Sequence, residues 1–304
     1  MTEPVDCLVV GGGPAGLTAA IYLARFHLRL HLVDAGRSRA ALIPRTRNHA
    51  GYPGGIAGTD LLDRMREQAA EFGVAVSHGI VETLRRDGVL FEALVDGVWI
   101  AARTVLLATG VVNNRPPIAP ELHDLALARG LLRYCPICDG YEVTDQRVGV
   151  IGTHAHGVDE AVFIRMFTRD VTLISPQAAH ALADDERARL EDLGIAIVDG
   201  PCAPLRVEGD AMIVTTPGGT LRFDSVYPAL GSVIRSELAV GLGADASTDG
   251  CLVVDDHQRT SIAGLYAAGD VARGLDQISH AMGEAGVAAT TIRNDLARTR
   301  QLAR

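Results

Sequence analysis

The stretch Cys7-Leu8-Val9-Val10-Gly11-Gly12-Gly13-Pro14-Ala15-Gly16 decides the fold of this 304-residue chain. Its first four residues are apolar and indicate a buried parallel strand. The next six contain the pattern G-x-G-x-x-G and open a helix. Gly11 permits a tight turn, Gly13 lets the backbone approach a pyrophosphate, and Gly16 lets the helix pack closely on the strand. The stretch therefore predicts a dinucleotide-binding site at the N-terminus of the first helix.

The next predicted strand supports this site. Leu30-His31-Leu32-Val33 is followed by Asp34, whose carboxylate is placed to accept hydrogen bonds from a ribose hydroxyl. Strand, loop, helix and acid are therefore all present in the required order. Both FAD and NAD bind a unit of this kind, so the identity of the dinucleotide stays open at this point.

The composition indicates a soluble globular protein with room for two domains, since 48% of the residues are apolar and 21% are charged. The formal net charge of -9 argues against a nucleic-acid partner, which needs clustered Lys and Arg. No apolar run approaches the ~20 residues of a membrane span, and the acidic N-terminus shows no secretory signal. We therefore expect a cytoplasmic protein that has no membrane partner.

A second motif, Cys135-Pro136-Ile137-Cys138-Asp139-Gly140, lies at mid-chain. Two cysteines at this spacing can close a small disulfide, and a helix start beside them lowers a thiol pKa. In a reducing compartment the spacing indicates redox or metal chemistry, but zinc needs two further ligands. His154 and His156 follow at a spacing unlike that of zinc sites. We expect dithiol–disulfide exchange and no metal, and we expect the other three cysteines to be buried.

Two later segments favour FAD as the dinucleotide. One is the predicted strand that runs from Thr104 into Ala108-Thr109-Gly110, and the other is Leu265-Tyr266-Ala267-Ala268-Gly269-Asp270. Both resemble motifs of flavoprotein reductases that have two dinucleotide sites. A helix rich in small residues follows over 277–286, and its N-terminus at Gln277 and Ile278 is expected to face the isoalloxazine.

With these motifs in order over nearly its whole length, the chain resembles the low-molecular-weight thioredoxin reductases. The resemblance implies an α/β fold with two Rossmann-like, three-layer dinucleotide-binding domains, of which the FAD domain is discontinuous. We expect the FAD domain at 1–113 and 247–304 and an NAD(P)H-type domain with the cysteine pair at 114–246. The crossings would lie near 113–117 and 244–250, which are rich in turn formers. The resemblance also implies a homodimer and a thioredoxin-like protein or small-molecule disulfide or dithiol as partner.

The same resemblance implies the roles of the site residues. Cys138 lies nearer the flavin, Cys135 attacks or releases the external disulfide, and Asp139 shuttles the proton. A carboxyl group beside the pair is useful because a leaving thiol must be protonated and an incoming thiol deprotonated. The residues expected to bind FAD are Gly11, Gly13, Pro14, Ala15, Gly16, Asp34, Asn48, Ala108, Thr109, Gly110, Gly269, Asp270, Gln277 and Ile278.

The second Rossmann-like unit has a strand at 147–151 and a helix at 158–164, but its loop departs from the pattern. The loop is Gly152-Thr153-His154-Ala155-His156-Gly157, so His154 replaces the glycine that makes room for a pyrophosphate. Residues 175–180 lack the His-Arg-Arg cluster with which the family clamps the 2′-phosphate of NADPH. The sequence thus predicts FAD as cofactor and argues against NADPH.

Four functions stay open. The first is electron exchange between flavin and an external disulfide without NADPH, with ferredoxin or another redox protein as donor. The second is an NADPH-dependent thioredoxin reductase whose atypical loop is helped by Arg165, Arg169 or His156. The third is a small-molecule dithiol oxidase that uses oxygen, and the fourth is a slow-cycling flavin redox sensor. Oxidases among the relatives commonly have His after the second cysteine, so Asp139 favours the reductase direction.

Overall fold

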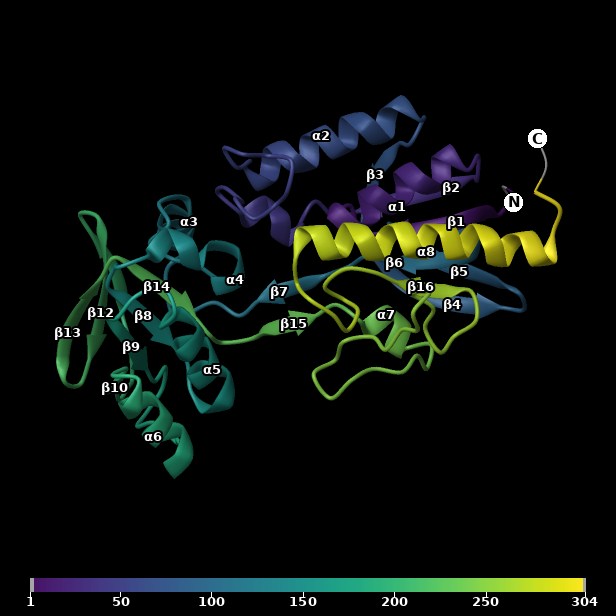
Figure 1. Cartoon of the computed structure of the whole chain (residues 1–304). Helices are drawn as coiled ribbons and strands as arrows, with labels where there is room; N and C mark the ends of the chain where they lie inside the picture. The colour runs from purple at the N-terminus through teal and green to yellow at the C-terminus, as the bar shows by residue number, and fades with distance from the viewer. Residues whose placement is uncertain (1–2, 303–304) are drawn as a thin grey trace.

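The computed structural model describes residues 3–302, which form two lobes joined by a pair of strands (Figure 1). The larger lobe contains the N-terminal part of the chain, purple to blue in Figure 1, and its C-terminal part, which runs from green to yellow. The smaller lobe contains the middle of the chain, in teal and green. This arrangement confirms the predicted α/β fold with two dinucleotide-binding units, the first of which is discontinuous.

A seven-stranded sheet forms the centre of the larger lobe, in the order β3-β2-β1-β6-β5-β4 with β16 paired to β6. β1 pairs in parallel with β2 and β6, and β16 joins β6 in parallel from the C-terminal part of the chain. A strand with parallel neighbours on both sides is buried on both faces, which explains the apolar run in β1. The elements are β1 Val5–Val10, α1 Pro14–Arg25, β2 Leu30–Asp34, the 3-10 helix η1 Arg39–Leu42, α2 Gly58–Glu71, β3 Val76–His78, β4 Val81–Asp87, β5 Leu90–Val95, β6 Val98–Leu107, α7 Glu237–Val240, β16 Leu265–Ala267 and α8 Ile278–Thr299.

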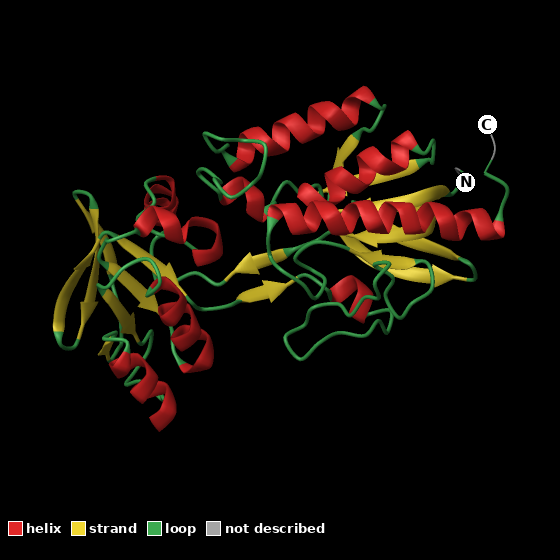
Figure 2. Ribbon diagram, viewed as in Figure 1, coloured by secondary structure: helices red, strands yellow, loops and turns green. Residues whose placement is uncertain are grey.

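Helices α1, α2 and α8 pack on one face of this sheet (Figure 2). Alternate residues of a strand face opposite sides, so Cys7 and Val9 join the core beneath these helices. Leu8 and Val10 join the core on the other face. The two cores place the glycine loop after β1 at the edge of the sheet, where ligands of such folds bind.

The smaller lobe has a four-stranded parallel sheet in the order β10-β9-β8-β14 and a three-stranded antiparallel sheet, β11-β12-β13. The parallel sheet is the second Rossmann-like unit, and all of β8 is buried. The elements are α3 Pro120–Ala128, α4 Pro136–Asp139, the 3-10 helix η2 Gly140–Val143, β8 Val148–Ile151, α5 His154–Ile164, β9 Val171–Ile174, α6 Asp184–Asp192, β10 Ala196–Val198, β11 Leu205–Glu208, β12 Ala211–Thr216, β13 Gly219–Phe223 and β14 Ser225–Pro228.

The two lobes are connected by β7, Val111–Asn113, and β15, Ser232–Ile234, which pair in antiparallel register. The chain leaves the larger lobe beside the expected crossing, but it returns earlier than expected. Ala239 and Ala244 already pack in the core of the larger lobe. The turn formers at 247–250 close a tight turn within that lobe, where the Ser247 amide bonds the Cys251 carbonyl at 2.8 Å. The turn-forming residues at 247–250 therefore belong to a loop within the larger lobe. The segment by which the chain returns to that lobe is the strand β15.

Individual elements follow the sequence closely except at their ends. β6 ends at Leu107, so Ala108-Thr109-Gly110 is the loop after the strand. α5 begins at His154, four residues before the apolar pattern that predicted it, because the exposed first turn of a helix has no apolar periodicity. α8 extends well beyond residue 286. Neither α8 nor any other helix within residues 3–302 combines the length and apolarity that a membrane span requires.

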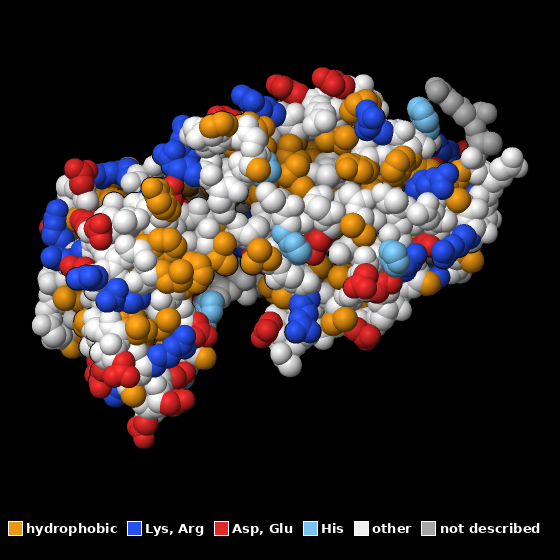
Figure 3. Space-filling model, viewed as in Figure 1, with side chains coloured by type: hydrophobic (Ala, Val, Ile, Leu, Met, Phe, Trp, Pro, Cys, Tyr) orange, Lys and Arg blue, Asp and Glu red, His pale blue; other side chains and the backbone are white. Residues whose placement is uncertain are grey.

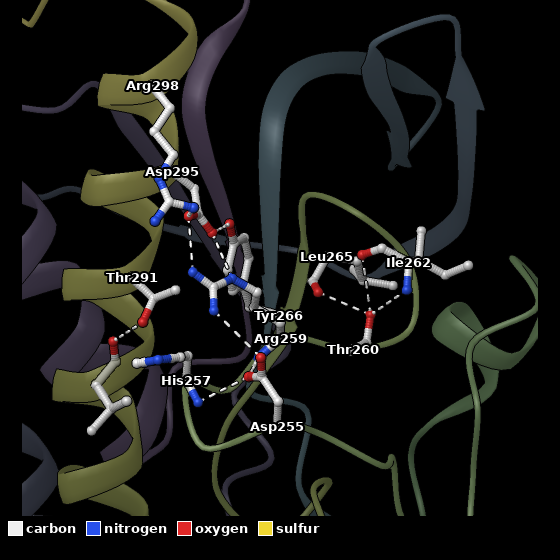
Figure 4. A network of polar contacts seen from close by, with 11 residues as sticks. Asp255, His257, Arg259, Thr260, Ile262, Leu265, Tyr266, Thr291, Asp295 and Arg298 are labelled. Carbon is white, nitrogen blue, oxygen red and sulfur yellow. Dashed lines mark hydrogen bonds and ion pairs between the residues drawn. The ribbon is translucent and has the colours of Figure 1, made fainter.

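A polar network ties the C-terminal half of α8 to β16 and to the loop before it (Figure 4). Arg259 donates to both carboxylate oxygens of Asp295 at 2.8 and 2.9 Å, and the Tyr266 hydroxyl donates to the same carboxylate at 2.9 Å. Arg259 also contacts Asp255 at 3.3 Å. The hydrogen bond from Arg259 is the main reason that the pKa of Asp295 lies below its usual value.

Asp295→Asn is expected to lower the free energy of unfolding at pH 7 by about 1 kcal/mol, a value discounted because the network is partly exposed. A carboxyl with a lowered folded-state pKa adds stability above its unfolded pKa of about 3.9 and loses it as the pH falls through the folded value. The difference between native protein and variant should therefore shrink below about pH 4. Urea unfolding at pH 7 and at pH 3 measures this difference.

The control for this experiment is Asp63→Asn, which removes an exposed contact with Arg66 within α2. It should leave stability almost unchanged at both pH values, because an exposed pair contributes little. A stability difference for Asp295→Asn that is as large at pH 3 as at pH 7 would contradict the assigned charge interaction.

Candidate active site

A cavity of about 680 Å³ lies at the carboxyl ends of β1, β2 and β6 and reaches the cysteine pair of the smaller lobe. Every residue that the sequence assigned to cofactor binding or catalysis lines it, except Gly16. The structure thus brings together residues that lie far apart in the chain. The cavity wall also contains arginines that the sequence did not single out, namely Arg37, Arg39, Arg45, Arg47, Arg129, Arg133 and Arg235.

The glycines of the first loop are required for different structural reasons. Gly11 has a φ of +107°, which disfavours any side chain, and a Cβ there would overlap the Ala108 carbonyl. A Cβ on Gly16 would overlap the Gly11 carbonyl oxygen, so Gly16 lets α1 pack closely on the loop that follows the strand. Gly13 lines the cavity, and a Cβ added there would contact only the Ser38 side chain, with 3.2 Å between the Cβ and the Ser38 Oγ. Packing therefore requires Gly11 and Gly16, whereas Gly13 keeps the cavity wall open.

Gly16→Ala is expected to destabilise the larger lobe by about 2–3 kcal/mol, because the added methyl group meets backbone that cannot move independently. The shift of the glycine loop should also release the bound cofactor. Thermal unfolding and the visible absorbance of the purified protein measure the two effects. Gly54→Ala is the matched control, since Gly54 has no neighbour within 4 Å of an added Cβ. Equal stability and colour in both variants would show that the loop is not as tightly packed as described.

Two carboxylates flank the glycine loop. Asp34 ends β2 and accepts the Gly36 amide at 3.1 Å, directly beneath Gly12. Asp270 is paired with Arg39 at 3.2 Å, and burial raises its pKa. Arg39 comes from the stretch 37–47, in which four of eleven residues are arginine. That arginine cluster was the only indication in the sequence of a basic partner for Asp270. It did not show which of the four arginines makes the contact.

Cys135 and Cys138 form a disulfide on the cavity wall. Cys135 is the N-cap of α4, and the Cys138 amide donates to its Sγ at 3.2 Å. Of the other cysteines, Cys7 and Cys202 are buried as expected, and burial raises their pKa values to about 12 and about 11. Cys251 is partly exposed, contrary to expectation, because it ends a surface turn. Burial thus suppresses thiolate formation at Cys7 and Cys202.

Residues of the larger lobe contact the disulfide directly. The Gln277 side-chain amide lies 3.3 Å from Cys135 Sγ and 3.2 Å from Cys138 Sγ. Asn48 donates to Gln277 Oε1 at 2.8 Å. The sequence placed both residues in the cofactor site, but it held no signal for this contact, since more than 130 residues separate Gln277 from the cysteines.

Asp139 has two partners that the sequence did not predict. Arg133 contacts Oδ2 at 2.8 Å, and the buried Tyr227 hydroxyl donates to Oδ1 at 2.8 Å. Burial raises the pKa of Asp139, while Arg133 and Tyr227 act in the opposite direction. Burial likewise raises the pKa of nearby Glu160 to about 7, with a further contribution from the Asp139 charge. The carboxyl group beside the disulfide therefore lies in surroundings that permit both protonated and ionised forms.

The second glycine loop keeps its packing residues, but it has His154 at the position that Gly13 occupies in the first loop. A Cβ on Gly157 would meet the Gly152 carbonyl carbon at 2.7 Å, so these two glycines let α5 pack on β8. His154 is exposed at the start of α5 and has a φ of +54°, the left-handed conformation that favours glycine. Its side chain stands at the helix N-terminus, where a phosphate would bind. After β9, Ser175 is buried, Pro176 is half-buried and Gln177 is exposed.

Known proteins resemble this chain over nearly its whole length. The pyridine nucleotide-disulphide oxidoreductase family matches residues 5–285. The thioredoxin reductase of Treponema pallidum (strain Nichols) is 32% identical over 95% of this chain and 96% of its own length. That of Mycolicibacterium smegmatis is 31% identical over 88% of each chain. The thioredoxin reductase structure from Streptococcus pyogenes MGAS5005 superposes with a TM-score of 0.89 at 26% identity, covering 98% of this chain and 100% of that chain.

The family implies FAD, and the cavity fits that cofactor. The glycine loop leaves backbone amides accessible at the N-terminus of α1, and arginines on the same wall suit a pyrophosphate. Within residues 3–302, no cluster of His, Cys, Asp and Glu could hold a metal ion. The complete first site, the disulfide on its wall and the match over residues 5–285 lead to one assignment. This chain belongs to the pyridine nucleotide-disulphide oxidoreductase family and is a flavoprotein disulfide oxidoreductase of the thioredoxin-reductase type.

Proposed function

We propose that this enzyme exchanges electrons between FAD and an external disulfide through Cys135 and Cys138, and that the donor is ferredoxin or another redox protein instead of NADPH. The contrast between the two glycine loops carries the proposal. The first loop leaves an open cavity wall, whereas His154 places a side chain at the N-terminus of α5. Residues 175–180 also contain no arginine for a 2′-phosphate. The second unit is therefore intact as a fold and poorly suited to NADPH.

In this proposal the chain's own residues divide the work. The glycine loop, Asp34 and Asp270 hold FAD, which supplies a two-electron carrier when bound. Reduction of the disulfide breaks the bond between the two sulfurs and consumes two electrons and two protons. Asp139 exchanges a proton with the thiols through its carboxyl oxygens, and its raised pKa favours the protonated form that such a transfer needs. Arg133 and Tyr227 keep the carboxyl group in place beside the pair.

The proposed substrate is a thioredoxin-like protein or a small-molecule disulfide. Ile137, which lies between the two cysteines, is half exposed, and Tyr141 and Met166 are more than three-quarters exposed. Figure 3 shows apolar side chains gathered on the surface of the smaller lobe. A protein disulfide with apolar residues around it suits such a surface, because protein interfaces favour aromatic residues and Met at their centre.

The proposal includes the organisation of the whole protein. We retain a FAD domain made of residues 1–113 and the C-terminal part, and we move its second segment from 247 back to the end of β15, because Ala239 and Ala244 pack in its core. We propose a homodimer, for which the exposed Tyr22 on α1 and Phe26, the residue that follows its last turn, provide apolar surface. Light scattering measures the oligomeric state.

We also propose a cytoplasmic location. It suits the three free cysteines, since reducing compartments preserve thiols.

Anaerobic mixing of the purified protein with NADPH, NADH or a dithiol tests the proposal, with flavin absorbance as the readout. We expect the dithiol to bleach the flavin and both nucleotides to leave it oxidised. Reduced ferredoxin, added in the same way, should bleach it if ferredoxin-type proteins are the donors.

Each alternative function has its own outcome in this experiment. Rapid bleaching by NADPH would overturn the proposal in favour of an NADPH-dependent thioredoxin reductase with an atypical loop. Bleaching by a dithiol followed by rapid oxygen consumption in air would indicate a dithiol oxidase. Slow bleaching by every donor would indicate a redox sensor.

A further inference from the structure

Gln277 connects the two lobes at the disulfide. It lies immediately before α8 in the larger lobe, and the cysteines belong to the smaller lobe. Its side-chain nitrogen is within hydrogen-bond distance of both sulfurs, at 3.3 Å from Cys135 Sγ and 3.2 Å from Cys138 Sγ. One amide group therefore reaches both sulfurs of the bond that opens on reduction.

The orientation of this amide is determined by its neighbours. The Ile137 carbonyl can only accept a hydrogen bond, so the Asn48 atom 3.3 Å away must be the donor nitrogen Nδ2. That nitrogen also lies 2.8 Å from Gln277, which must present Oε1 to it as acceptor. The NH2 group of Gln277 is then left facing the sulfurs. The Thr46 hydroxyl, 2.9 Å from Asn48 Oδ1, completes the chain as a donor.

The two sulfurs depend on Gln277 to different degrees. Cys135 Sγ also accepts the Cys138 backbone amide at 3.2 Å. Within residues 3–302, Gln277 supplies the only hydrogen-bond donor to Cys138 Sγ. Opening the S–S bond with two electrons and one proton produces one thiol and one thiolate, and a thiolate is a much stronger acceptor than a disulfide sulfur. The electrons come from the two-electron carrier of the proposed function.

We propose that Gln277 is a catalytic residue that stabilises the thiolate of the opened Cys135–Cys138 pair, and that Asn48 is the positioning residue that orients it. The proposal rests on electron exchange through this cysteine pair. It also makes the stability of the thiolate depend on how the two lobes lie, because Gln277 and Asn48 belong to the larger lobe and the cysteines to the smaller one. The thiolate is stabilised only while the motif lies against that lobe, where Arg47 and Glu142 also pair across the lobes at 3.2 Å.

The test measures how fast the reduced pair is alkylated by iodoacetamide as a function of pH, with mass spectrometry to identify Cys135 and Cys138. A Cys251→Ser background removes the one free thiol that is partly exposed. In Gln277→Leu the pH midpoint of alkylation should move up by about one unit, which makes the thiolate about tenfold scarcer below the midpoint. Gln277→Glu should move it further, since a carboxylate repels a thiolate. Asn48→Leu should cause a smaller shift in the same direction.

Ser279→Ala is the matched control. Ser279 contacts His49 at 3.0 Å and so joins the same two segments as the Asn48–Gln277 bond, without touching a sulfur. Its alkylation profile should equal that of the native protein. An unchanged midpoint in Gln277→Leu and Gln277→Glu would overturn the proposal, and loss of flavin with an unchanged midpoint would make Gln277 a cofactor contact only. The midpoint is measured without turnover, so the inference can fail or stand independently of the proposed electron donor.

Discussion

Replacing Cys138 by serine is expected to lower turnover of an external disulfide or dithiol by at least about a thousandfold, because serine cannot form a disulfide and ionises far less readily than cysteine. The change should leave the fold intact, since Cys138 is partly exposed on the cavity wall and α4 begins two residues before it, at Pro136. The flavin should remain bound but should no longer be bleached by a dithiol. Steady-state assays and anaerobic titration of the flavin absorbance measure the two losses.

Cys251→Ser provides the control for this result. Cys251 is the one free cysteine that is partly exposed, and it lies on a surface turn outside the cavity. Its replacement should leave turnover within about a factor of two, as for most surface substitutions. Cys135→Ser should also abolish turnover, because exchange with the external partner needs both thiols. Turnover above about a tenth of the native rate in Cys138→Ser would mean that electrons reach the substrate by another route.

Sequence reasoning predicted the packing of the first glycine loop because that packing is set by local geometry. Gly11 and Gly16 are adjacent in the chain to the strand and helix that they join, so a short pattern contains the whole structural requirement. The cysteine pair was visible for the same reason, since the spacing itself permits the disulfide. Patterns of this kind need no knowledge of the tertiary structure.

The partners of these residues were not predictable in the same way. Tyr227 reaches Asp139 from 88 residues away, on a strand whose apolar sequence gave no reason to select one hydroxyl. The contact between Gln277 and the sulfurs depends on how the two lobes lie against each other. Such contacts are set by tertiary packing, so no local period or motif reports them. The early return of the chain at β15 was missed because turn formers mark loops within a domain as readily as links between domains.

In the proposed function, the two dinucleotide-binding units of this chain differ in role as well as in position. Both keep the glycines that pack a helix against a strand, Gly16 in the first and Gly152 with Gly157 in the second. Only the first keeps the glycine that opens the wall for a phosphate. Under the proposal, the packing residues keep the second unit folded so that it carries the cysteine pair, while the first unit binds the cofactor.

The combined change His154→Gly, Pro176→Arg and Gln177→Arg is expected to tighten NADPH binding by at least about a hundredfold, because each charge-assisted hydrogen bond to the 2′-phosphate contributes about 1.5–3 kcal/mol. The arginines are placed at Pro176 and Gln177 because the preceding Ser175 is buried. Glycine at 154 suits the left-handed backbone there, where a side chain costs about 1 kcal/mol. Calorimetric titration with NADPH and NADH measures the affinities.

The comparison between nucleotides and between partial variants makes this prediction specific. NADH lacks the 2′-phosphate, so its affinity should rise only through the opened loop and by much less than that of NADPH. His154→Gly alone should produce that smaller gain for both nucleotides, and the two arginines without it should produce little, because the pyrophosphate still meets the His154 side chain. If the native protein already binds NADPH as tightly as the triple variant, the second loop is competent and the donor is NADPH after all. If the triple variant gains nothing while remaining folded, the obstruction lies elsewhere in the smaller lobe.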